Sequence, residues 1–253
     1  MSADSVDHVL TDGEIGQRVE ALLPAIRARG DEIASLRQLP RDLVDSLKGA
    51  GAFRMSMPAT WGGPEMSLRR QVELIEAVAV ADPSVSWCVM IGSDAGFYSA
   101  FLEDAVAREL WRDLDDVTAG WVFPAGRAVP VDGGFRVSGR WQFGSGCTHA
   151  DVIIGGCLIM GDVGSPAVGP DGLPVTRIVV ARADQFEIMD TWYTTGLAGS
   201  GSNDYRCQDL FVPAEHTFSF AEPVRRPGAL YAFPGAFFAN MQGVGLGLAR
   251  ARH

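Results

Sequence analysis

The chain has 253 residues, of which 47% are hydrophobic, and its formal net charge is −10. That hydrophobic content excludes a largely disordered chain, and the length is enough for one or two domains with a sizeable core. Because nucleic-acid surfaces need clustered Lys and Arg, the acidic balance predicts no nucleic-acid partner.

The longest apolar run, near residues 85–102, is interrupted by small and polar residues. It therefore predicts a buried helix rather than a membrane span. The N-terminus lacks the basic and apolar regions of a secretory signal, so a cytoplasmic location is the default expectation. The four cysteines form no Cys-x-x-Cys pair and are expected to be buried free thiols. No two histidines have a metal-ligand spacing, so no metal is expected.

The first part of the chain predicts helices, each opened or closed by residues that suit helix caps. Pro24 is expected to kink or divide the first helix. The fourth helix is apolar nearly all round and should be buried. The cap positions are Thr11 with Glu14, Pro40, Gly51, Ser67 and Asp82-Pro83.

The pattern changes near Thr118, after which short alternations of Val, Ile, Phe, Trp and Gly predict strands. Asp132-Gly133 lies between two such runs and is typical of a hairpin. Residues 118–213 therefore predict a compact, mostly antiparallel barrel or sandwich. A connector follows, and from about Gly235 one more helix is expected, still running at the last residue. This order is that of an α+β protein.

Two stretches, residues 138–146 and 190–213, place aromatic residues, hydroxyls and glycines at the ends of expected strands. Glycine lets a backbone approach a flat ligand closely. The rings of Trp141 and Phe143 and the hydroxyl of Ser145 would suit a planar, polar-edged cofactor such as a flavin. The same alternation also fits ordinary core residues of a strand.

Three stretches together carry a family resemblance: MPATWGGPE at 57–65, VSGRWQFGSG at 137–146, and the segment 191–213 with its GSGSND core. With them the chain resembles the acyl-CoA dehydrogenase-like flavoproteins. Within that family it is most similar to the two-component, flavin-dependent (group D) monooxygenases that hydroxylate aromatic or other small organic substrates.

The resemblance implies an α+β fold with three parts. An N-terminal helical domain would span residues 1–115, and an antiparallel β-barrel would span 116–222. Residues 223–253 would form a connector and the first helix of a C-terminal helical domain. The rest of that domain, a four-helix bundle in the family, is missing from the chain.

The resemblance also implies a flavin between the barrel and the bundle, with Ser145 near the N5 or O4 edge of the ring. A His that faces the substrate in aromatic-hydroxylating relatives is absent from residues 87–98, where Asp94 or Ser93 could take its place. The implied catalytic residues are Ser145 and Asp94, and the implied flavin-binding residues are Trp121, Phe123, Phe143, Gly144, Ser145, Trp192, Ser202 and Asn203.

The implied activity is that of an oxygenase component. It would take reduced FMN or FAD from a separate flavin reductase and use O2 to oxidise a small organic substrate. An acyl-CoA dehydrogenase-type desaturase and a non-catalytic subunit are the alternatives. The chain could be a fragment, one subunit of a heteromer with a chain that carries the bundle, or a flavin-free relative; a homo-oligomer is also expected.

Overall fold

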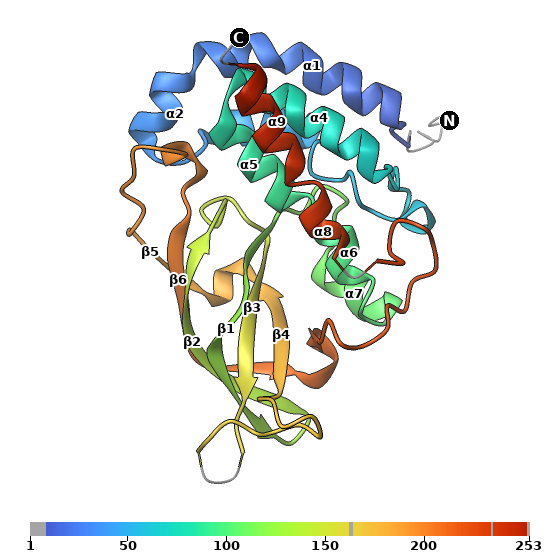
Figure 1. Ribbon diagram of the computed structural model, residues 1–253, viewed down its shortest axis with the longest axis vertical. Helices are drawn as coiled ribbons and strands as arrows, with labels where there is room; N and C mark the ends of the chain where they lie inside the picture. The colour runs from blue at the N-terminus through green and yellow to red at the C-terminus, as the bar shows by residue number, and fades with distance from the viewer. Residues whose placement is uncertain (1–8, 162–163, 234, 252–253) are drawn as a thin grey trace, which may run out of the picture.

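The computed structural model describes residues 9–161, 164–233 and 235–251. Residues 1–8, which carry the expectation about a secretory signal, lie outside this part of the chain. Figure 1 shows a layer of helices standing on the end of a twisted β-sheet, with the last helices of the chain back in the helical layer. The α+β order expected from the sequence is confirmed.

Several helices of this layer begin at the N-cap residues predicted from the sequence. The hydroxyl of Thr11 accepts a hydrogen bond from the Glu14 amide while the Glu14 carboxylate accepts from the Thr11 amide, which is a complete capping box. The first helix runs through Pro24, so the division falls after it, at Arg29. The helices are α1 (Asp12–Ala28), α2 (Gly30–Leu36), α3 (Arg41–Ala50), α4 (Leu68–Ala81), α5 (Pro83–Gly92), α6 (Ala95–Ser99) and α7 (Asp104–Leu110), with a short 3-10 turn η1 at Ala59–Trp61.

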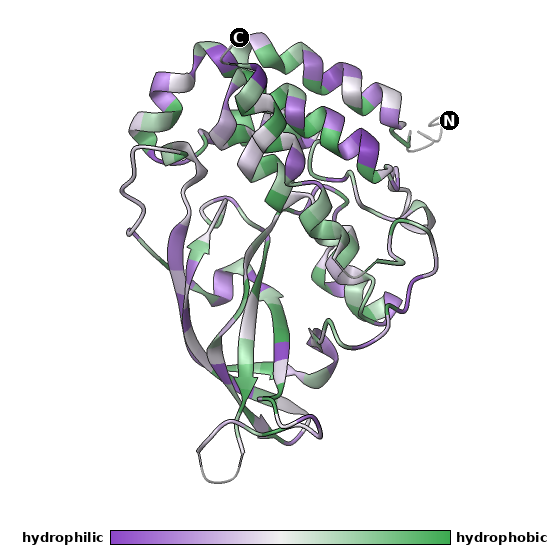
Figure 2. Ribbon diagram, viewed as in Figure 1, coloured by the Kyte–Doolittle hydropathy of each residue, from purple (hydrophilic) through white to green (hydrophobic). Residues whose placement is uncertain are grey.

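Helix α5 is held at the centre of this layer. The Asp82 carboxylate accepts from the amides of Ser84 and Val85, and Pro83 occupies the first helical position. Most of its side chains are buried, as its all-round apolar sequence predicts. In Figure 2, hydrophilic and hydrophobic bands alternate along α1 and α4, which cover it from outside.

Within the described residues the strands form one seven-stranded sheet in the order β5-β6-β2-β1-β3-β4-β7. The β1–β2 hairpin turns at the predicted Gly133, whose φ is 76°. Most of the strand pairs are antiparallel, as expected. The β1–β3 pair is parallel, so the sheet is mixed. The bounds are β1 (Thr118–Val131), β2 (Gly134–Gly144), β3 (Val152–Ile159), β4 (Thr176–Arg182), β5 (Glu187–Met189), β6 (Asn203–Pro213) and β7 (Thr217–Phe218).

The pairing of β2 with β6 brings the two aromatic, glycine-rich stretches side by side. Trp141 pairs with Tyr205, and Gly144 pairs with Asn203. Trp141 is fully buried and stacks on the Tyr205 ring with centroids 5.4 Å apart. Of the two aromatic residues proposed as ring faces from the sequence, Trp141 is therefore a core residue.

The C-terminal segment forms two short helices, α8 (Ala236–Ala239) and α9 (Gln242–Arg250), where one was expected. In the first turn of α9 the amides of Gly243 and Val244 bond to the carbonyls of Asn240 and Met241, three residues back, which tightens the backbone where the two helices join. Helix α9 packs on α4. In the described part of the chain, no helix has the length and apolar character needed to cross a bilayer.

Candidate functional site

Four side chains form a continuous polar chain where the helical layer meets the sheet. The indole Nε1 of Trp87, on α5, donates to Ser145 Oγ at 2.8 Å. Ser145 Oγ lies 2.8 Å from Ser202 Oγ, which lies 2.7 Å from Ser200 Oγ. The three serines are 6%, 4% and 1% exposed. We call these three residues the serine chain.

Glycine lets the backbone fold tightly enough to place the serine chain. A Cβ added at Gly144 would lie 2.7 Å from the Tyr205 ring and 2.9 Å from the Asn203 carbonyl oxygen. Two residues later, the Gly146 amide donates to the Ser200 carbonyl at 2.9 Å. Between the other two serines Gly201 has a φ of 53°, in the left-handed region. The turn after β2 and the loop before β6 are thereby locked together.

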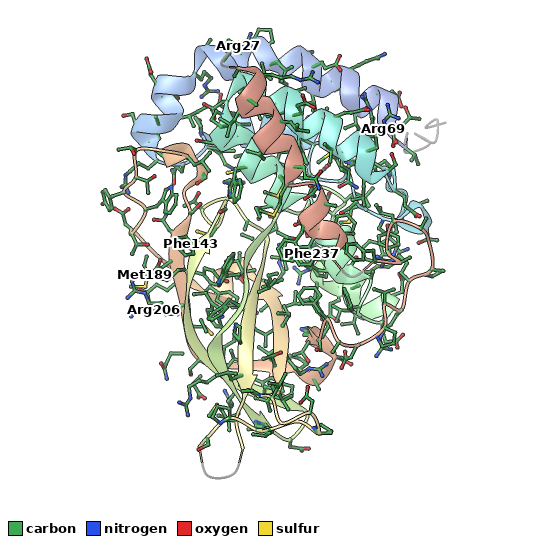
Figure 3. The ribbon with its side chains drawn as sticks, viewed as in Figure 1. Arg27, Arg69, Phe143, Met189, Arg206 and Phe237 are labelled. Atoms are coloured by element: carbon green, nitrogen blue, oxygen red, sulfur yellow. The ribbon has the colours of Figure 1, made fainter. Side chains whose placement is uncertain are left out.

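Aromatic side chains from β1, β2 and the loop before β6 lie at least partly exposed near the end of the sheet. Phe143 is 50% exposed and meets the rings of Trp121 and Trp192 edge to face, with centroids 5.9 Å and 6.3 Å away. Phe123, two residues after Trp121, is also exposed. Figure 3 places Phe143 at the upper end of β2, below the helices. We call Trp121, Phe123, Phe143 and Trp192 the aromatic surface.

Phe143 reaches this surface through an unusual backbone. Its φ is 59°, a conformation that residues with a Cβ rarely adopt, and the β2–β6 register shifts between Trp141 and Gly144. This irregularity turns the Phe143 side chain away from the core that Trp141 occupies. Strain of this kind concentrates at binding sites.

Asn203 holds the loop that carries Trp192. Its Oδ1 accepts from the amides of Thr191 and Trp192 at 2.9 and 3.0 Å, and its Nδ2 donates to the Gly201 carbonyl. Its side chain is thus engaged with the backbone, so it positions Trp192 rather than offering free polar atoms.

Arg37, at the end of α2, is a residue that sequence reasoning missed. It donates to the Trp192 carbonyl at 3.0 Å, pairs with Asp190 and covers the Tyr193 ring at 3.9 Å. No local motif marks it, because its partners lie more than 150 residues away in the sequence.

Asp94 shares no hydrogen bond with the serine chain. It is buried at the junction of α5 and α6, where Asn240 Nδ2 donates to it at 3.0 Å and Tyr98 is its other partner. Burial raises the pKa of the Asp94 carboxyl well above its usual range, and these two hydrogen bonds only partly oppose the rise. The carboxyl faces Asn240, which follows α8.

A second buried titratable side chain, His149, lies under the turn that presents Ser145. A Cβ added at Gly146 would come within 3.2 Å of His149 Nε2. Neither ring nitrogen of this 7% exposed residue has a hydrogen-bond partner among the described residues. Burial lowers the pKa of His149 to about 4, so the imidazole is neutral near pH 7.

The cysteines are buried free thiols, as expected. Two of them adjoin the serine chain: Cys88 Sγ donates to the Ser200 carbonyl and Cys147 Sγ to the Gly201 carbonyl. Burial raises the pKa of Cys147 to about 12, which keeps the thiol protonated and unreactive. No cluster of metal-ligating side chains occurs among the residues that the structure describes.

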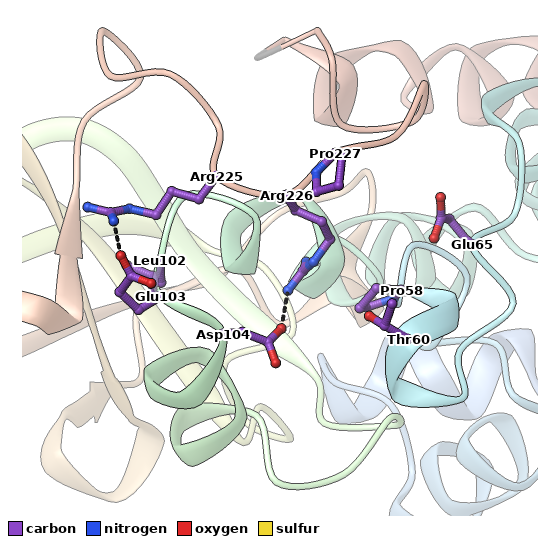
Figure 4. Close-up of a pocket in the computed structure, with 9 residues that line it drawn as sticks. All are labelled: Pro58, Thr60, Glu65, Leu102, Glu103, Asp104, Arg225, Arg226 and Pro227. Carbon is purple, nitrogen blue, oxygen red and sulfur yellow. Dashed lines mark hydrogen bonds and ion pairs between the residues drawn. The ribbon is translucent and has the colours of Figure 1, made fainter.

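The first motif stretch, 57–65, lies at a different place. It lines a cavity together with residues 102–104 and the connector at 225–227 (Figure 4). There Arg225 pairs with Glu103, and Arg226 lies 3.5 Å from Asp104. These contacts fasten the connector to the helical layer.

The acyl-CoA dehydrogenase N-terminal domain model matches residues 20–114. This segment is similar to acyl-CoA dehydrogenase N-terminal domains. Indole-3-acetate monooxygenase of Pseudomonas putida is 33% identical over 240 residues, which make up 93% of this chain and 60% of that protein. The oxygenase subunit HsaA of a flavin-dependent monooxygenase from Rhodococcus jostii is 33% identical over 208 residues, or 81% of this chain and 52% of HsaA.

The fold agrees with these relationships. The crystal structure of 3-HSA hydroxylase from Rhodococcus sp. RHA1 superimposes with a TM-score of 0.82 at 28% identity, covering 92% of this chain and 62% of the hydroxylase. The predicted family resemblance and fold class are confirmed. The chain spans between about half and three fifths of the length of the curated relatives that it matches.

The site lies where the helical layer meets the sheet. The helical layer supplies Trp87, whereas the sheet and its loops supply the serine chain and the aromatic surface. Of the predicted flavin-binding residues, Trp121, Phe143 and Trp192 form ring contacts, and Ser145 and Ser202 share a hydrogen bond. Asn203 binds the backbone instead, and the predicted Asp94 lies outside the hydrogen-bond network of the site.

Proposed function

We propose that this chain belongs to the oxygenase component of a flavin-dependent monooxygenase, which uses reduced FMN or FAD and O2 to oxidise a small organic substrate. The observation that carries the proposal is the position of Ser145, a hydroxyl bonded to Trp87 and Ser202, two residues along the chain from Phe143, whose exposed ring contacts both Trp121 and Trp192. Support comes from the relatives, which are an indole-3-acetate monooxygenase and the oxygenase subunit of a flavin-dependent monooxygenase.

A flavin fits these residues. Phe143 and Trp121 are exposed enough to offer ring surface. Gly144 lets β2 pack closely on Tyr205 and Asn203 of β6. When bound, reduced flavin supplies the electrons for the reaction with O2. In this proposal the Ser145 hydroxyl binds the N5 or O4 edge, and the aromatic surface excludes water from it. Asn203 and Ser202 act by holding Trp192 and Ser145 in place.

Asp94, between α5 and α6, is proposed to act on the substrate rather than on the flavin. Its carboxyl accepts a hydrogen bond from Asn240, so it joins α5–α6 to the segment between α8 and α9. A neutral carboxylic acid at this position could hold a proton for a substrate without presenting a negative charge.

The proposed partners follow from the two-component arrangement. A separate flavin reductase would deliver the reduced cofactor, and the assembly would be cytoplasmic. The exposed aromatic surface would be completed either by further copies of this chain or by a chain that carries the C-terminal helical bundle. We propose the division 1–115, 116–222 and 223–253 as its domain organisation.

Anaerobic titration with FMN and FAD, in both redox states, tests the proposal. Flavin fluorescence is expected to be quenched on binding to the chain. Phe143→Ala should weaken flavin binding about fivefold or more, since it removes one contact of about 1 kcal/mol. Phe211→Ala is the matched control, because Phe211 is also an exposed ring on the sheet, 42% exposed, but packs beside Arg136 instead.

The catalytic part is tested by mixing the flavin-loaded chain with O2, a reductase and small aromatic substrates. Incorporation of one atom of labelled oxygen into the substrate is the expected result. Oxidation of an acyl-CoA without O2 would instead support the dehydrogenase alternative. Failure to bind any flavin, alone or with a bundle-carrying partner, would contradict the proposal.

A further inference from the structure

Strand β1 leaves its regular pairing with β3 at the point where it carries two rings of the aromatic surface. Trp121 pairs with Gly155 and Pro124 pairs with Gly156, so one step along β3 is matched by three steps along β1. The extra residues form a bulge, and a bulge redirects the side chains that it carries. At this bulge Trp121 is 39% exposed and Phe123 is 62% exposed.

The side chain of Tyr205, on β6, ties this bulge to β3. Its hydroxyl accepts from the Trp121 amide at 2.7 Å and donates to the Ile154 carbonyl, also at 2.7 Å. Tyr205 is fully buried, and burial raises the pKa of its phenol well above the usual range, so the hydroxyl keeps the proton that it donates. One hydroxyl therefore fixes an amide of β1 and a carbonyl of β3 relative to each other.

The stacked ring of Trp141 supports the same bulge from its neighbouring position. Its Nε1 donates to the Gly156 carbonyl at 2.7 Å. Gly156 approaches the bulge so closely that an added Cβ would overlap the Val122 carbonyl. Because the Trp141 and Tyr205 rings stack nearly parallel, with 12° between their planes, their two hydrogen bonds to β3 are held at a fixed spacing.

The ring of Tyr205 also limits the position of Phe143. Gly144 directly follows Phe143, and a Cβ added there would lie 2.7 Å from the Tyr205 ring. The Phe143 ring in turn meets the Trp121 ring edge to face. Tyr205 thus contacts the backbone beside both rings: its hydroxyl binds Trp121, and its ring packs against Gly144.

We propose that Tyr205 is a positioning residue, which sets the Trp121 ring against the Phe143 ring and so fixes the shape of the aromatic surface. The role of that shape in holding a flavin rests on the proposed function. Tyr205 is buried, so it acts through the Trp121 amide and through Gly144 rather than by touching a ligand.

The hydrogen bond to Trp121 is tested without any ligand, by hydrogen exchange. Labelling with ¹⁵N-tryptophan reports only six backbone amides, and Trp121→Phe identifies the one in question. In the wild-type chain this amide should exchange clearly more slowly than in an unstructured peptide, although its side chain is partly exposed. In Tyr205→Phe, which loses only the hydroxyl, its exchange should be about tenfold faster or more.

Tyr231→Phe is the matched control. Tyr231 is also a buried tyrosine, and its hydroxyl donates to the Ser56 carbonyl at 2.9 Å, away from the sheet. Both variants should lower Tm by about 2–6 °C, because each leaves buried backbone groups without a partner. Only Tyr205→Phe should speed exchange of the Trp121 amide. An unprotected Trp121 amide in the wild type, or equal exchange in the two variants, would overturn the inference.

The effect on the aromatic surface is tested by titration with FMN. Tyr205→Phe should weaken FMN binding about fivefold, whereas Tyr231→Phe should leave it within about twofold of wild type. In a Trp121→Ala background, Tyr205→Phe should change the affinity by less than about twofold, because the ring that the hydroxyl positions is already gone.

The outcomes separate the two proposals. A fivefold loss in both backgrounds, or no loss in either, would show that Tyr205 does not act through Trp121, while the flavin site would stand. If the wild-type chain binds no FMN, alone or with a bundle-carrying partner, the proposed function fails. The exchange of the Trp121 amide then still decides whether Tyr205 holds this residue in place.

Discussion

Phe143 combines an exposed ring with a backbone conformation that phenylalanine rarely takes, at φ 59°. We expect Phe143→Asn to leave the free energy of unfolding within about 1 kcal/mol of wild type, because Asn tolerates this conformation and offsets the lost ring contacts. Flavin binding should nevertheless weaken. Urea unfolding and flavin titration measure the two effects. Phe143→Ala, which keeps the strain and loses the ring, should be the less stable of the two variants.

The buried carboxyl of Asp94 gives a pH dependence with a definite sign. Its pKa is raised in the folded chain, so the folded state binds more protons and stability falls as the pH rises above the usual Asp range. Asp94→Asn keeps an oxygen for Asn240 but cannot ionise. Its Tm relative to wild type should therefore increase between pH 5 and pH 9. A constant difference in Tm would contradict the raised pKa.

The pH dependence of stability that His149 contributes has the opposite sign. Its pKa is lowered to about 4 from 6.5, so the unfolded state binds the extra proton and stability falls as the pH drops through this window. Of the stability at pH 7, about 3 kcal/mol should be lost by pH 4 through this group alone. His149→Phe removes the titration while keeping a ring against Phe53. Urea unfolding across pH 4–7 should be flatter for the variant, and an equal slope would disprove the assignment.

The junction of β5 and β6 depends on one side chain. Asn203 accepts from two backbone amides, and Asn203→Ala would leave both without an acceptor in a partly buried loop. We expect a loss of about 1–3 kcal/mol in unfolding free energy and weaker flavin binding, because Trp192 would lose its position. Asn203→Asp, which keeps the accepting oxygen, should retain most of both. Equal losses in the two variants would show that the amide hydrogen bonds are not what matters.

Sequence patterns predicted the helix caps and the β-hairpin well. What they could not predict depends on contacts between distant residues. Caps and the Asp132-Gly133 turn are local, so Thr11, Ser67 and Asp82 could be read directly. Alternation puts Trp141 and Phe143 on one face, yet the irregularity before Gly144 separates them into core and surface. Such a backbone change depends on packing against Tyr205 and has no local pattern. Asp94 could be singled out but not placed, because its partner Asn240 lies 146 residues away.

The whole molecule places its site at a junction rather than inside one layer. Trp87 comes from the helical layer, Ser145 from the turn after β2, and Ser200 and Ser202 from the loop before β6. The pairing of β2 with β6 brings the last two of these segments together. The family resemblance implied a flavin role for Ser145, whereas its hydrogen bonds to Trp87 and Ser202 follow only from the folded structure.

At its C-terminal end the chain returns to the helical layer, where α9 packs on α4. Helix α9 approaches α4 through glycine: a Cβ at Gly247 would lie 2.5 Å from Ala79 Cβ and 2.6 Å from the Glu76 carbonyl oxygen. At Gly245, two residues earlier on the same helix, a Cβ would meet nothing within 4 Å. Gly247→Ala should therefore destabilise the chain by about 1–3 kcal/mol.

Gly245→Ala is the matched control, and it should stabilise the chain by up to about 1 kcal/mol because alanine favours a helix. Urea unfolding measures both changes. Hydrogen exchange of the α9 amides should speed up only in Gly247→Ala, since that variant pushes α9 away from α4. The same displacement would pull Asn240 from Asp94, so the pH dependence attributed to Asp94 should change in Gly247→Ala and not in Gly245→Ala. Identical behaviour of the two variants would mean that α9 is not packed on α4 in solution.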